Sequence, residues 1–375
     1  MLTKDTELTF QVAFSMLKGA SYDVWLALQE RGISLSDFFE ADDMALRNAA
    51  GGDKMRLPDR YARDEAMVRA RRELEFTSKH NIRPLWVEGD DYPWRMVNVA
   101  NPPLVIYMLG QCNLNVEHVA SVVGTRKLTP CGAEFTRRFV GDLAGYFPDL
   151  VVVSGLAYGT DAVAHQAALD AGVPTVGVLA HGLDMMYPAS HRDLAKRMLA
   201  AGGGLISQYP SGTRIYRNNF LERNRIVATL SDATVVIESE IKGGAMSTAR
   251  HAFEADRDVY AVPGRVSDPM SAGCNHLIRK QRASLLTAAA DLIERTGWTP
   301  LGAHINPDQR SLFPELGGEP KVIYDYLRFE PEPRGADQIH LHTGLPMGRL
   351  LSLLADMEFD GVLIRHPGNR FSVAL

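Results

Sequence analysis

Between residues 102 and 296, short continuous apolar runs alternate with segments in which apolar residues recur at spacings of three and four. The runs predict strands, and the segments between them predict helices. Strands that lack polar alternation are typical of a parallel sheet that helices cover on both faces. The pattern therefore predicts a doubly wound, mostly parallel α/β sheet. The expected strands are Leu104–Leu109, Val119–Val123, Leu150–Val153, Pro174–Ala180, Gly204–Ser207, Ala233–Glu238 and Val259–Val262.

The two ends of the chain have different patterns from the middle. Residues 6–80 carry helical spacing without strand-like runs, so we expect a small all-helical domain over residues 1–80. Residues 297–318 are rich in Pro and Gly, which predicts a linker. Residues 319–375 show three short helical patterns and then the hairpin-like runs Val362–His366 and Phe371–Ala374. This order predicts a winged helix, and residues 81–296 remain as the α/β domain.

Charge limits the ways in which the chain can bind anions. It has 40 Lys and Arg against 45 Asp and Glu, a net charge of −5. This balance excludes a protein that coats nucleic acid by overall positive charge, so any anion site must be a local patch. The charge is also uneven, because residues 81–312 are neutral while residues 313–375 carry a net charge of −3.

The cysteines and the hydropathy pattern exclude other classes of protein. Cys112, Cys131 and Cys274 are widely spaced, which argues against a disulfide framework or a zinc site and suits a reducing cytosol. No window approaches the ~20 apolar residues of a membrane span. We therefore expect a cytoplasmic protein with no membrane partner, no metal and no cofactor.

Three glycine-rich segments each follow an expected strand. The carboxyl ends of parallel strands meet at one edge of the sheet, so these segments are expected to lie together. Glycine allows close backbone approach to an anion, and a helix start offers free N–H groups. Each segment can equally be a plain strand-to-helix turn, and none has the Walker A or the dinucleotide-binding pattern. The candidate phosphate-binding residues are Gly124, Thr125 and Arg126, then Ser154, Gly155 and Gly159, and finally Lys242, Gly243, Gly244, Ser247 and Thr248.

A fourth segment, residues 214–225, combines four arginines with a single acid and two aromatic residues. Guanidinium groups beside aromatic rings suit single-stranded nucleic acid, whose unpaired bases are free to stack. The alternative is a solvated charged helix that Phe220 anchors to the core. The candidate residues are Arg217, Phe220, Arg223, Asn224 and Arg225.

No set of side chains predicts a catalytic centre. Asp161 and His165 are four residues apart on one expected helix and so share a face, but a helical histidine near a sheet is usually a hydrogen-bonded core residue. The pairs His181 with Asp184 and Glu238 with Glu240 likewise lack a nucleophile and an orienting group. We therefore expect a binding protein and assign no catalytic residue.

At these residues the sequence resembles the DNA-processing protein A family (DprA/Smf), most densely from about residue 92 to residue 283. The resemblance is carried by an ordered series of motifs rather than by a single one. They include Pro102-Pro103-Leu104, Val123-Gly124-Thr125-Arg126, Ser154-Gly155-Leu156-Ala157-Tyr158-Gly159, Gly182-Leu183-Asp184, Phe220 with Arg223-Asn224-Arg225, Ser247-Thr248-Ala249, Val262-Pro263-Gly264 and Gly273-Cys274-Asn275.

The resemblance implies a Rossmann-like core that binds single-stranded DNA, forms homodimers and loads the recombinase RecA during natural transformation. It implies a phosphate pocket at Gly124, Thr125 and Arg126, with Arg217 as a further basic contact. Residues 1–80 resemble the family's sterile-alpha-motif-like or helix–hairpin–helix-like domain, and residues 319–375 resemble its winged helix. The chain departs from the family pattern at Gln208, Leu221, Gln281 and Arg282, which affects local loop shape.

Two other interpretations remain. The same sheet resembles nucleotide phosphoribohydrolases of the lysine-decarboxylase-like (LOG) type, which would act on a nucleoside monophosphate. In this chain, however, their catalytic Glu falls at Arg250 and their third motif Gly at Met246. Losing the acid removes the general acid–base role while keeping an anion loop. The other interpretation is a small-ligand sensor whose winged helix reads duplex DNA, and the acidity of residues 313–375 argues against it.

Overall fold

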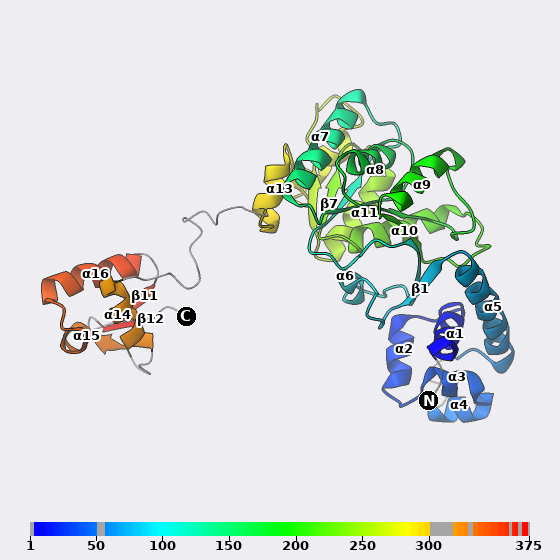
Figure 1. The fold of residues 1–375 in the computed structure, drawn as a ribbon, viewed down its shortest axis with the longest axis horizontal. Helices are drawn as coiled ribbons and strands as arrows, with labels where there is room; N and C mark the ends of the chain where they lie inside the picture. Colours follow the sequence, from blue (N-terminus) through cyan, green and yellow to red (C-terminus); the bar gives the residue numbers. More distant parts are fainter. Residues whose placement is uncertain are drawn as a thin grey trace. The chain divides into compact units, whose positions relative to one another are not determined.

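The structure is a computed structural model that describes residues 4–50, 57–300, 318–328, 333–359, 362–366 and 370–373. It contains two compact units, Met1–Leu301 and Gly302–Leu375, which we describe one at a time. Figure 1 shows the course of the chain through both units. No described helix is both long enough and apolar enough to cross a membrane.

The larger unit is built on a nine-stranded sheet with the order β1-β2-β6-β5-β4-β3-β7-β8-β9. From β6 to β9 every neighbouring pair is parallel, which confirms the predicted mostly parallel α/β sheet. The strands are β1 (Ile82–Trp86), β2 (Val105–Gly110), β3 (Val119–Val123), β4 (Val151–Ser154), β5 (Thr175–Val178), β6 (Gly204–Ser207), β7 (Ala233–Val236), β8 (Asp258–Ala261) and β9 (Ser284–Leu285).

One edge of the sheet differs from the sequence expectation. β2 was counted among the parallel strands because its run is apolar throughout, but it pairs antiparallel with both β1 and β6. Its apolar run reflects burial on both faces, which does not fix strand direction. β1 was not expected as a strand. It contains Pro84, and proline is tolerated here because β1 is the edge strand of the sheet.

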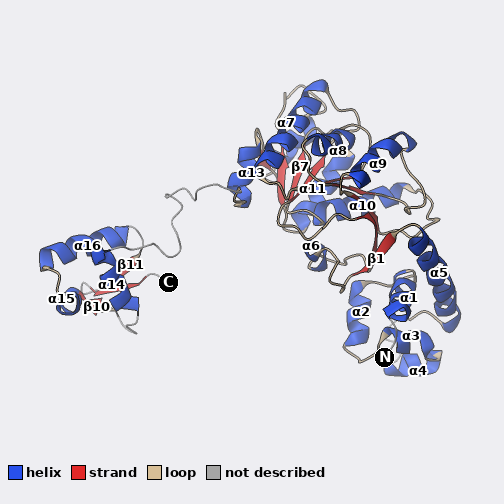
Figure 2. Cartoon of the chain, viewed as in Figure 1, coloured by secondary structure: helices blue, strands red, loops and turns tan. Residues whose placement is uncertain are grey.

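Helices cover both faces of this sheet (Figure 2). On one face, Ala120 and Val122 of β3 pack in a core with residues of α7 (Pro130–Tyr146) and α8 (Thr160–Asp170). On the other face, Val119 and Val123 belong to a core that includes residues of α10 (Arg217–Thr229) and α11 (Gly244–Glu254). The alternation along β3 is that of a pleated strand buried on both sides. The remaining helical segments are α6 (Trp94–Val97), η1 (Ala189–His191), α9 (Arg192–Ala200), α12 (Ala272–Arg279) and α13 (Ala289–Thr296).

The described residues between 4 and 79 form helices ahead of the sheet, and residues 51–56 lie outside the described part of the chain. The core joins these helices to the sheet, because Trp25 of α2 meets Trp86 of β1 edge to face with ring centroids 5.9 Å apart. Arg63 is fully buried in this region and donates to the carbonyl of Phe38 and to Asp43 at 2.7 Å. The helices are α1 (Lys4–Ser15), α2 (Tyr22–Gln29), α3 (Leu35–Glu40), α4 (Asp43–Ala49) and α5 (Arg60–Lys79).

The smaller unit has the helix order and the strands of a winged helix, as predicted. Its three-stranded sheet has the order β10-β12-β11, and β11 pairs antiparallel with β12. The turn at 367–369 and most of the expected linker, residues 301–317, lie outside the described residues. The elements are α14 (Gly318–Arg328), β10 (Arg334–Gly335), α15 (Ala336–Thr343), α16 (Met347–Phe359), β11 (Leu363–His366) and β12 (Arg370–Val373).

Candidate nucleic-acid interface

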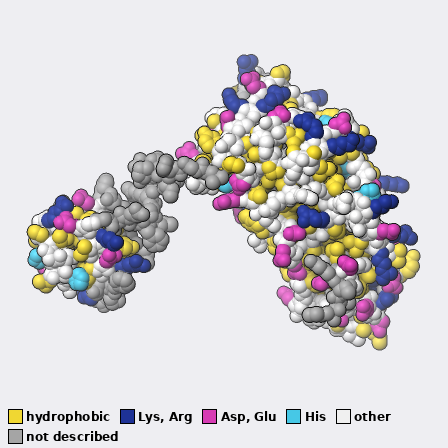
Figure 3. Space-filling model, viewed as in Figure 1, with side chains coloured by type: hydrophobic (Ala, Val, Ile, Leu, Met, Phe, Trp, Pro, Cys, Tyr) yellow, Lys and Arg dark blue, Asp and Glu magenta, His cyan; other side chains and the backbone are white. Residues whose placement is uncertain are grey.

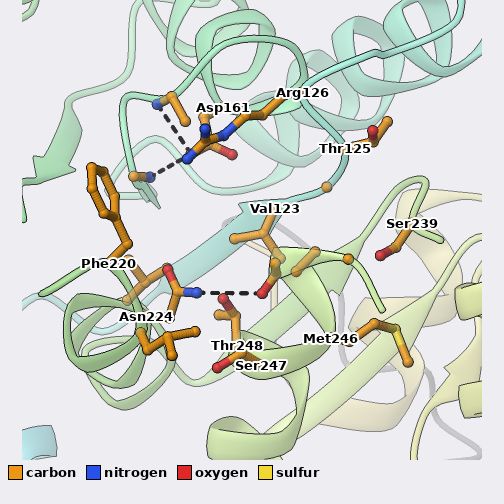
Figure 4. A pocket seen from close by; sticks show the side chains of 18 of the residues that line it. Val123, Thr125, Arg126, Asp161, Phe220, Asn224, Ser239, Met246, Ser247 and Thr248 are labelled. Atoms are coloured by element: carbon orange, nitrogen blue, oxygen red, sulfur yellow. Dashed lines mark hydrogen bonds between the residues drawn. The ribbon is translucent and has the colours of Figure 1, made fainter. Parts of the chain in front are cut away.

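A cavity of about 960 Å³ opens at the carboxyl edge of the parallel strands. It lies where the strand order reverses, between the loops that follow β3 and β7, and this switch point is the usual ligand site of such sheets. Loops after β3, β4 and β7 line it together with the first half of α10 (Figure 4). Its lining contains six Lys and Arg side chains against two acids, so the local field is positive although the whole chain is acidic.

The loop after β3 contributes Gly124, Thr125 and Arg126 to the pocket wall. The Thr125 amide donates to the carbonyl of Glu238 at 2.7 Å, which ties this loop to the end of β7. A Cβ on Gly124 would collide with the side chain of Thr160, so this position requires glycine for close approach. Arg126 is exposed, and its guanidinium lies 5.8 Å from the ring centre of Phe220.

Helix α10 begins at Arg217, four residues before Leu221, where the apolar spacing of the sequence predicts the helix to start. The first turn therefore carries Arg217, and residues at spacings of three and four from it share one side of the helix. Arg217, Phe220, Arg223 and Asn224 all line the pocket. Just before the helix, Tyr216 also lines the pocket, and 58% of this residue's surface is exposed, so its ring is available for stacking.

Arg223 lies at the back of the pocket and is almost fully buried. It donates to the carbonyl of Gly155 and to the carbonyl of Val178 at 2.6 Å. Burial lowers the pKa of Arg223, and the nearby Asp161 carboxylate opposes that shift. Arg223 thus joins α10 to two strand ends, and its placement is structural even though it borders the cavity.

In the loop after β4, two backbone amides donate hydrogen bonds to a side chain of the protein itself. Asp161 accepts hydrogen bonds from the amides of Gly155 at 3.1 Å and Ala157 at 3.2 Å. Burial raises the pKa of Asp161, while the charge of Arg223 and these amides lower it. Asp161 therefore occupies the N–H groups that a bound phosphate would need at this loop.

Three candidate residues lie outside the pocket lining. The Ser154 hydroxyl is buried and donates to the carbonyl of Val122 at 2.6 Å. Gly159 has φ +76° and packs against the carbonyl of Thr125, where a side chain has no room. Arg225 follows Asn224 around α10 and donates to the carbonyls of Ala100 at 3.2 Å and Asn101 at 2.7 Å. The sequence pattern could not predict these contacts, because the carbonyl groups involved lie far away along the chain.

The loop after β7 brings Lys242, Gly243, Gly244, Ser247 and Thr248 to the pocket, as expected. Gly243 is the N-cap of α11 and has no side chain to occupy the amides of the first turn, so a ligand anion can approach them. The Ser247 hydroxyl is buried without a hydrogen-bond partner among the described residues. On the facing helix, Asn224 donates to the carbonyl of Gly244 at 3.3 Å.

Several lining residues are not among the contacts that the sequence analysis proposed. They are Lys127, Tyr187, Ser239, Glu240 and Arg250. Glu240 and Arg250 were considered only as positions of catalytic acids, and no contact was assigned to the other three. Arg250, at the position of the phosphoribohydrolase acid, lies 3.9 Å from Glu254 and is exposed.

Asp161 and His165, which share a face of α8, form hydrogen bonds with different groups and not with each other. The Thr175 hydroxyl donates to the carbonyl of Val152 and accepts from Nδ1 of His165, both at 2.7 Å. Burial lowers the pKa of His165 to about 3, so the ring is neutral at ordinary pH. His165 thus has the hydrogen-bonded core role that the sequence favoured.

At the amino ends of β3 and β4, three side chains approach one another. Potential ligand atoms of Glu117, His118 and Asp149 lie within 4.8 Å of one another. Nδ1 of His118 is 2.8 Å from one Asp149 carboxylate oxygen and 2.9 Å from the other. This direct pairing accounts for the cluster, which is remote from the pocket because it lies at the opposite edge of the strands.

Fold and pocket together define a doubly wound α/β protein with a cationic, partly aromatic pocket at the switch point of its sheet. The family model described as DNA recombination-mediator protein A matches residues 83–297, and the one described as DprA winged helix domain matches residues 307–369. The chain therefore belongs to the DNA recombination-mediator protein A family.

Relatives extend this similarity over the whole chain. Protein Smf of Synechocystis is 30% identical over 98% of this chain and 99% of its own length. The X-ray structure of DNA processing protein A from Streptococcus pneumoniae has a TM-score of 0.61 at 27% identity, covering 76% of this chain and 95% of that one. A Helicobacter pylori DNA processing protein A structure, described for its single-stranded DNA binding mode, has a TM-score of 0.51 at 27% identity. It covers 58% of this chain and 96% of its own.

Proposed function

We propose that this protein binds single-stranded DNA in the pocket at the switch point and acts as a recombination mediator. The observation that carries this proposal is the combination, in one open cavity, of exposed cations with the rings of Tyr216 and Phe220. Guanidinium and ammonium groups hold phosphates of any sequence, and rings stack on unpaired bases for roughly 1–3 kcal/mol each. Duplex DNA offers no unstacked base to these rings.

The phosphate contacts are assigned to Arg126, Arg217 and Lys242, together with the start of α11, whose first-turn amides no side chain caps. Phe220 supplies a stacking ring, held from one side by Arg126. Arg223 and Asp161 maintain the shape of the pocket from below. Binding in this arrangement alters no bond of the DNA.

The finer part of the proposal concerns partners and setting. Family membership and the relatives named for DNA processing support a role in which the protein covers incoming single strands and loads RecA during natural transformation. We propose that it does so in the cytoplasm as a homodimer formed through the α/β domain. The expected signature is faster RecA filament growth on DNA that a single-strand-binding protein already covers. Light scattering after gel filtration measures the dimer directly.

The central experiment compares one labelled oligonucleotide as a single strand and as a duplex, by fluorescence anisotropy across a salt series. We expect tighter binding of the single strand and a fall in affinity of about 0.7 log units per log unit of salt for each neutralised phosphate. Equal affinity for both forms would overturn the assignment. Release of free adenine from AMP by the pure protein would favour the phosphoribohydrolase interpretation instead.

A further inference from the structure

The second half of α5 carries basic side chains that the pocket does not use. From residue 69 to residue 80 the chain has four Lys and Arg against two Glu, and Arg69 and Arg72 are exposed. The ion pairs that the structure describes on α5 use Arg60 and Arg63, in its first half. Figure 3 shows Lys and Arg side chains along the edge of the larger unit that α5 forms in Figure 1.

These side chains form one face together with two rings. Arg69, Arg72, Phe76 and His80 lie at helical spacings of three and four, so they share one side of α5. The rings of Phe76 and His80 are in contact, with centroids 4.4 Å apart. We call these four residues the α5 basic face. It repeats the pairing of guanidinium groups and rings found in the pocket.

A direct contact connects this face to the pocket. Glu73, on the same side of α5, accepts from the amide of Ser211 at 2.9 Å and from its hydroxyl at 2.5 Å. Ser211 belongs to the loop that leads to Arg217 at the pocket, and six residues span at most about 20 Å. Along this loop, Arg214 and Tyr216 are exposed. Cations and rings therefore follow one another from the pocket to α5.

We propose that a DNA strand too long for the pocket leaves it past Tyr216, crosses the loop at Arg214 and continues on the α5 basic face. Arg69 and Arg72 hold phosphates there, and the Phe76–His80 pair offers a ring surface to a base. The helical domain thereby lengthens the single-strand site of the α/β domain. This inference rests on the proposed function, because it extends the same binding site.

The test uses the full chain and oligothymidines of two lengths, about 5 and about 25 nucleotides. The double variant Arg69→Ala with Arg72→Ala is expected to bind the long strand about fivefold more weakly than the parent, with unchanged affinity for the short strand. Its salt slope on the long strand should fall by about 1.4, the value for two lost phosphates.

The matched control is Arg47→Ala with Arg71→Ala, which removes the same charge from exposed positions of the same helical region, with Arg71 on the other side of α5. It should bind both strands like the parent. Thermal unfolding of all variants verifies that the pocket remains folded.

The outcomes separate the two proposals. If the parent binds neither strand, the proposed function fails and the extension fails with it. If the parent binds both strands and the Arg69/Arg72 variant matches the control on the long one, the extension alone is wrong. An equal loss on short and long strands would also overturn it, because the arginines would then act on the pocket itself.

Discussion

At the scale of single residues, the arginines of segment 214–225 divide into two kinds. Arg217 is exposed at the pocket, whereas Arg223 is buried on two carbonyls and Arg225 is bonded to the backbone of residues 100–101. The sequence predicts all three of these arginines as DNA contacts, because they lie in one segment that combines guanidinium groups with aromatic residues. Which carbonyl lies opposite each guanidinium depends on how strands far apart in the chain are arranged, and no local pattern contains that information.

The exposed arginines should contribute to the affinity for single-stranded DNA and have little effect on the stability of the fold. We expect Arg126→Ala with Arg217→Ala to weaken binding to all single-stranded sequences alike and to lower the salt slope by about 1.4, since two phosphates lose their partners. Anisotropy titrations with two unrelated oligonucleotides at several salt concentrations measure this. Unchanged binding by the double variant would refute the assignment of the pocket.

The buried arginine should show the opposite behaviour. Arg223→Ala leaves Asp161 without its neighbouring positive charge and the carbonyl of Val178 without its donor. Removing one partner from such a buried set costs about 3–5 kcal/mol. Urea unfolding of Arg223→Ala and of Arg217→Ala tests this prediction. The free energy of unfolding of Arg217→Ala should be close to that of the parent. Equal stability of the two variants would contradict the structural role of Arg223.

His165 should make stability depend on pH. Its folded pKa of about 3 lies below its value of ~6.5 in an unfolded chain, so the unfolded state binds the extra proton between these two values. Stability from this group is complete above pH ~6.5 and falls by up to about 1.4 kcal/mol per pH unit on acidification toward pH 3. His165→Gln should flatten the curve of stability against pH over that window. Parallel curves for parent and His165→Gln would exclude this linkage.

At the scale of elements, the sequence predicted the α/β order and the meeting of the loops that follow the parallel strands. Continuous apolar runs identified β3, β4 and β7, and their following loops do meet at the switch point. It did not predict the antiparallel edge formed by β1 and β2, because strand direction is set by long-range pairing. It also began α10 too late, since Arg217, Asn218 and Asn219 offer no apolar spacing.

The close contact between the loop after β3 and helix α8 leads to a prediction at Gly124. We expect Gly124→Ala to push this loop away from Thr160 on α8, at a cost of about 1–3 kcal/mol and with weaker single-strand binding. Gly141→Ala in α7 has open space around its Cβ and should instead stabilise the helix by roughly 0.5–1 kcal/mol. Thermal unfolding and anisotropy on both variants provide the comparison. If the Gly124→Ala protein were as stable as the parent, the loop after β3 could move away from Thr160 without loss of stability, and the prediction would be wrong.

At the scale of the whole molecule, negative charge is concentrated in the smaller unit, because residues 313–375 carry a net charge of −3 and the much longer stretch 1–312 carries −2. The smaller unit is acidic, and the exposed Arg349 of its helix α16 is engaged by Glu319 at 2.8 Å. Duplex readers place free cations on such a helix, because phosphates dominate affinity. A contact with a protein suits this surface better than a contact with DNA.

This difference leads to a prediction for the winged helix. We expect Arg349→Ala to leave the affinity for single strands within about twofold of the parent, since its charge is already paired. The same anisotropy titration applies. A tenfold loss, comparable to that of a pocket variant, would show that the winged helix takes part in DNA binding.

The carboxylate of Asp161 has one more consequence. Enzymes that hydrolyse nucleotides bind the phosphates with unpaired backbone amides at a turn before a helix. In the turn after β4 of this chain, the Asp161 carboxylate accepts hydrogen bonds from those amides instead. The amides of Gly155 and Ala157 are therefore already engaged within the protein. In the proposed binding mode, a phosphate of the strand would therefore be held by the loops after β3 and β7 and not by the turn after β4.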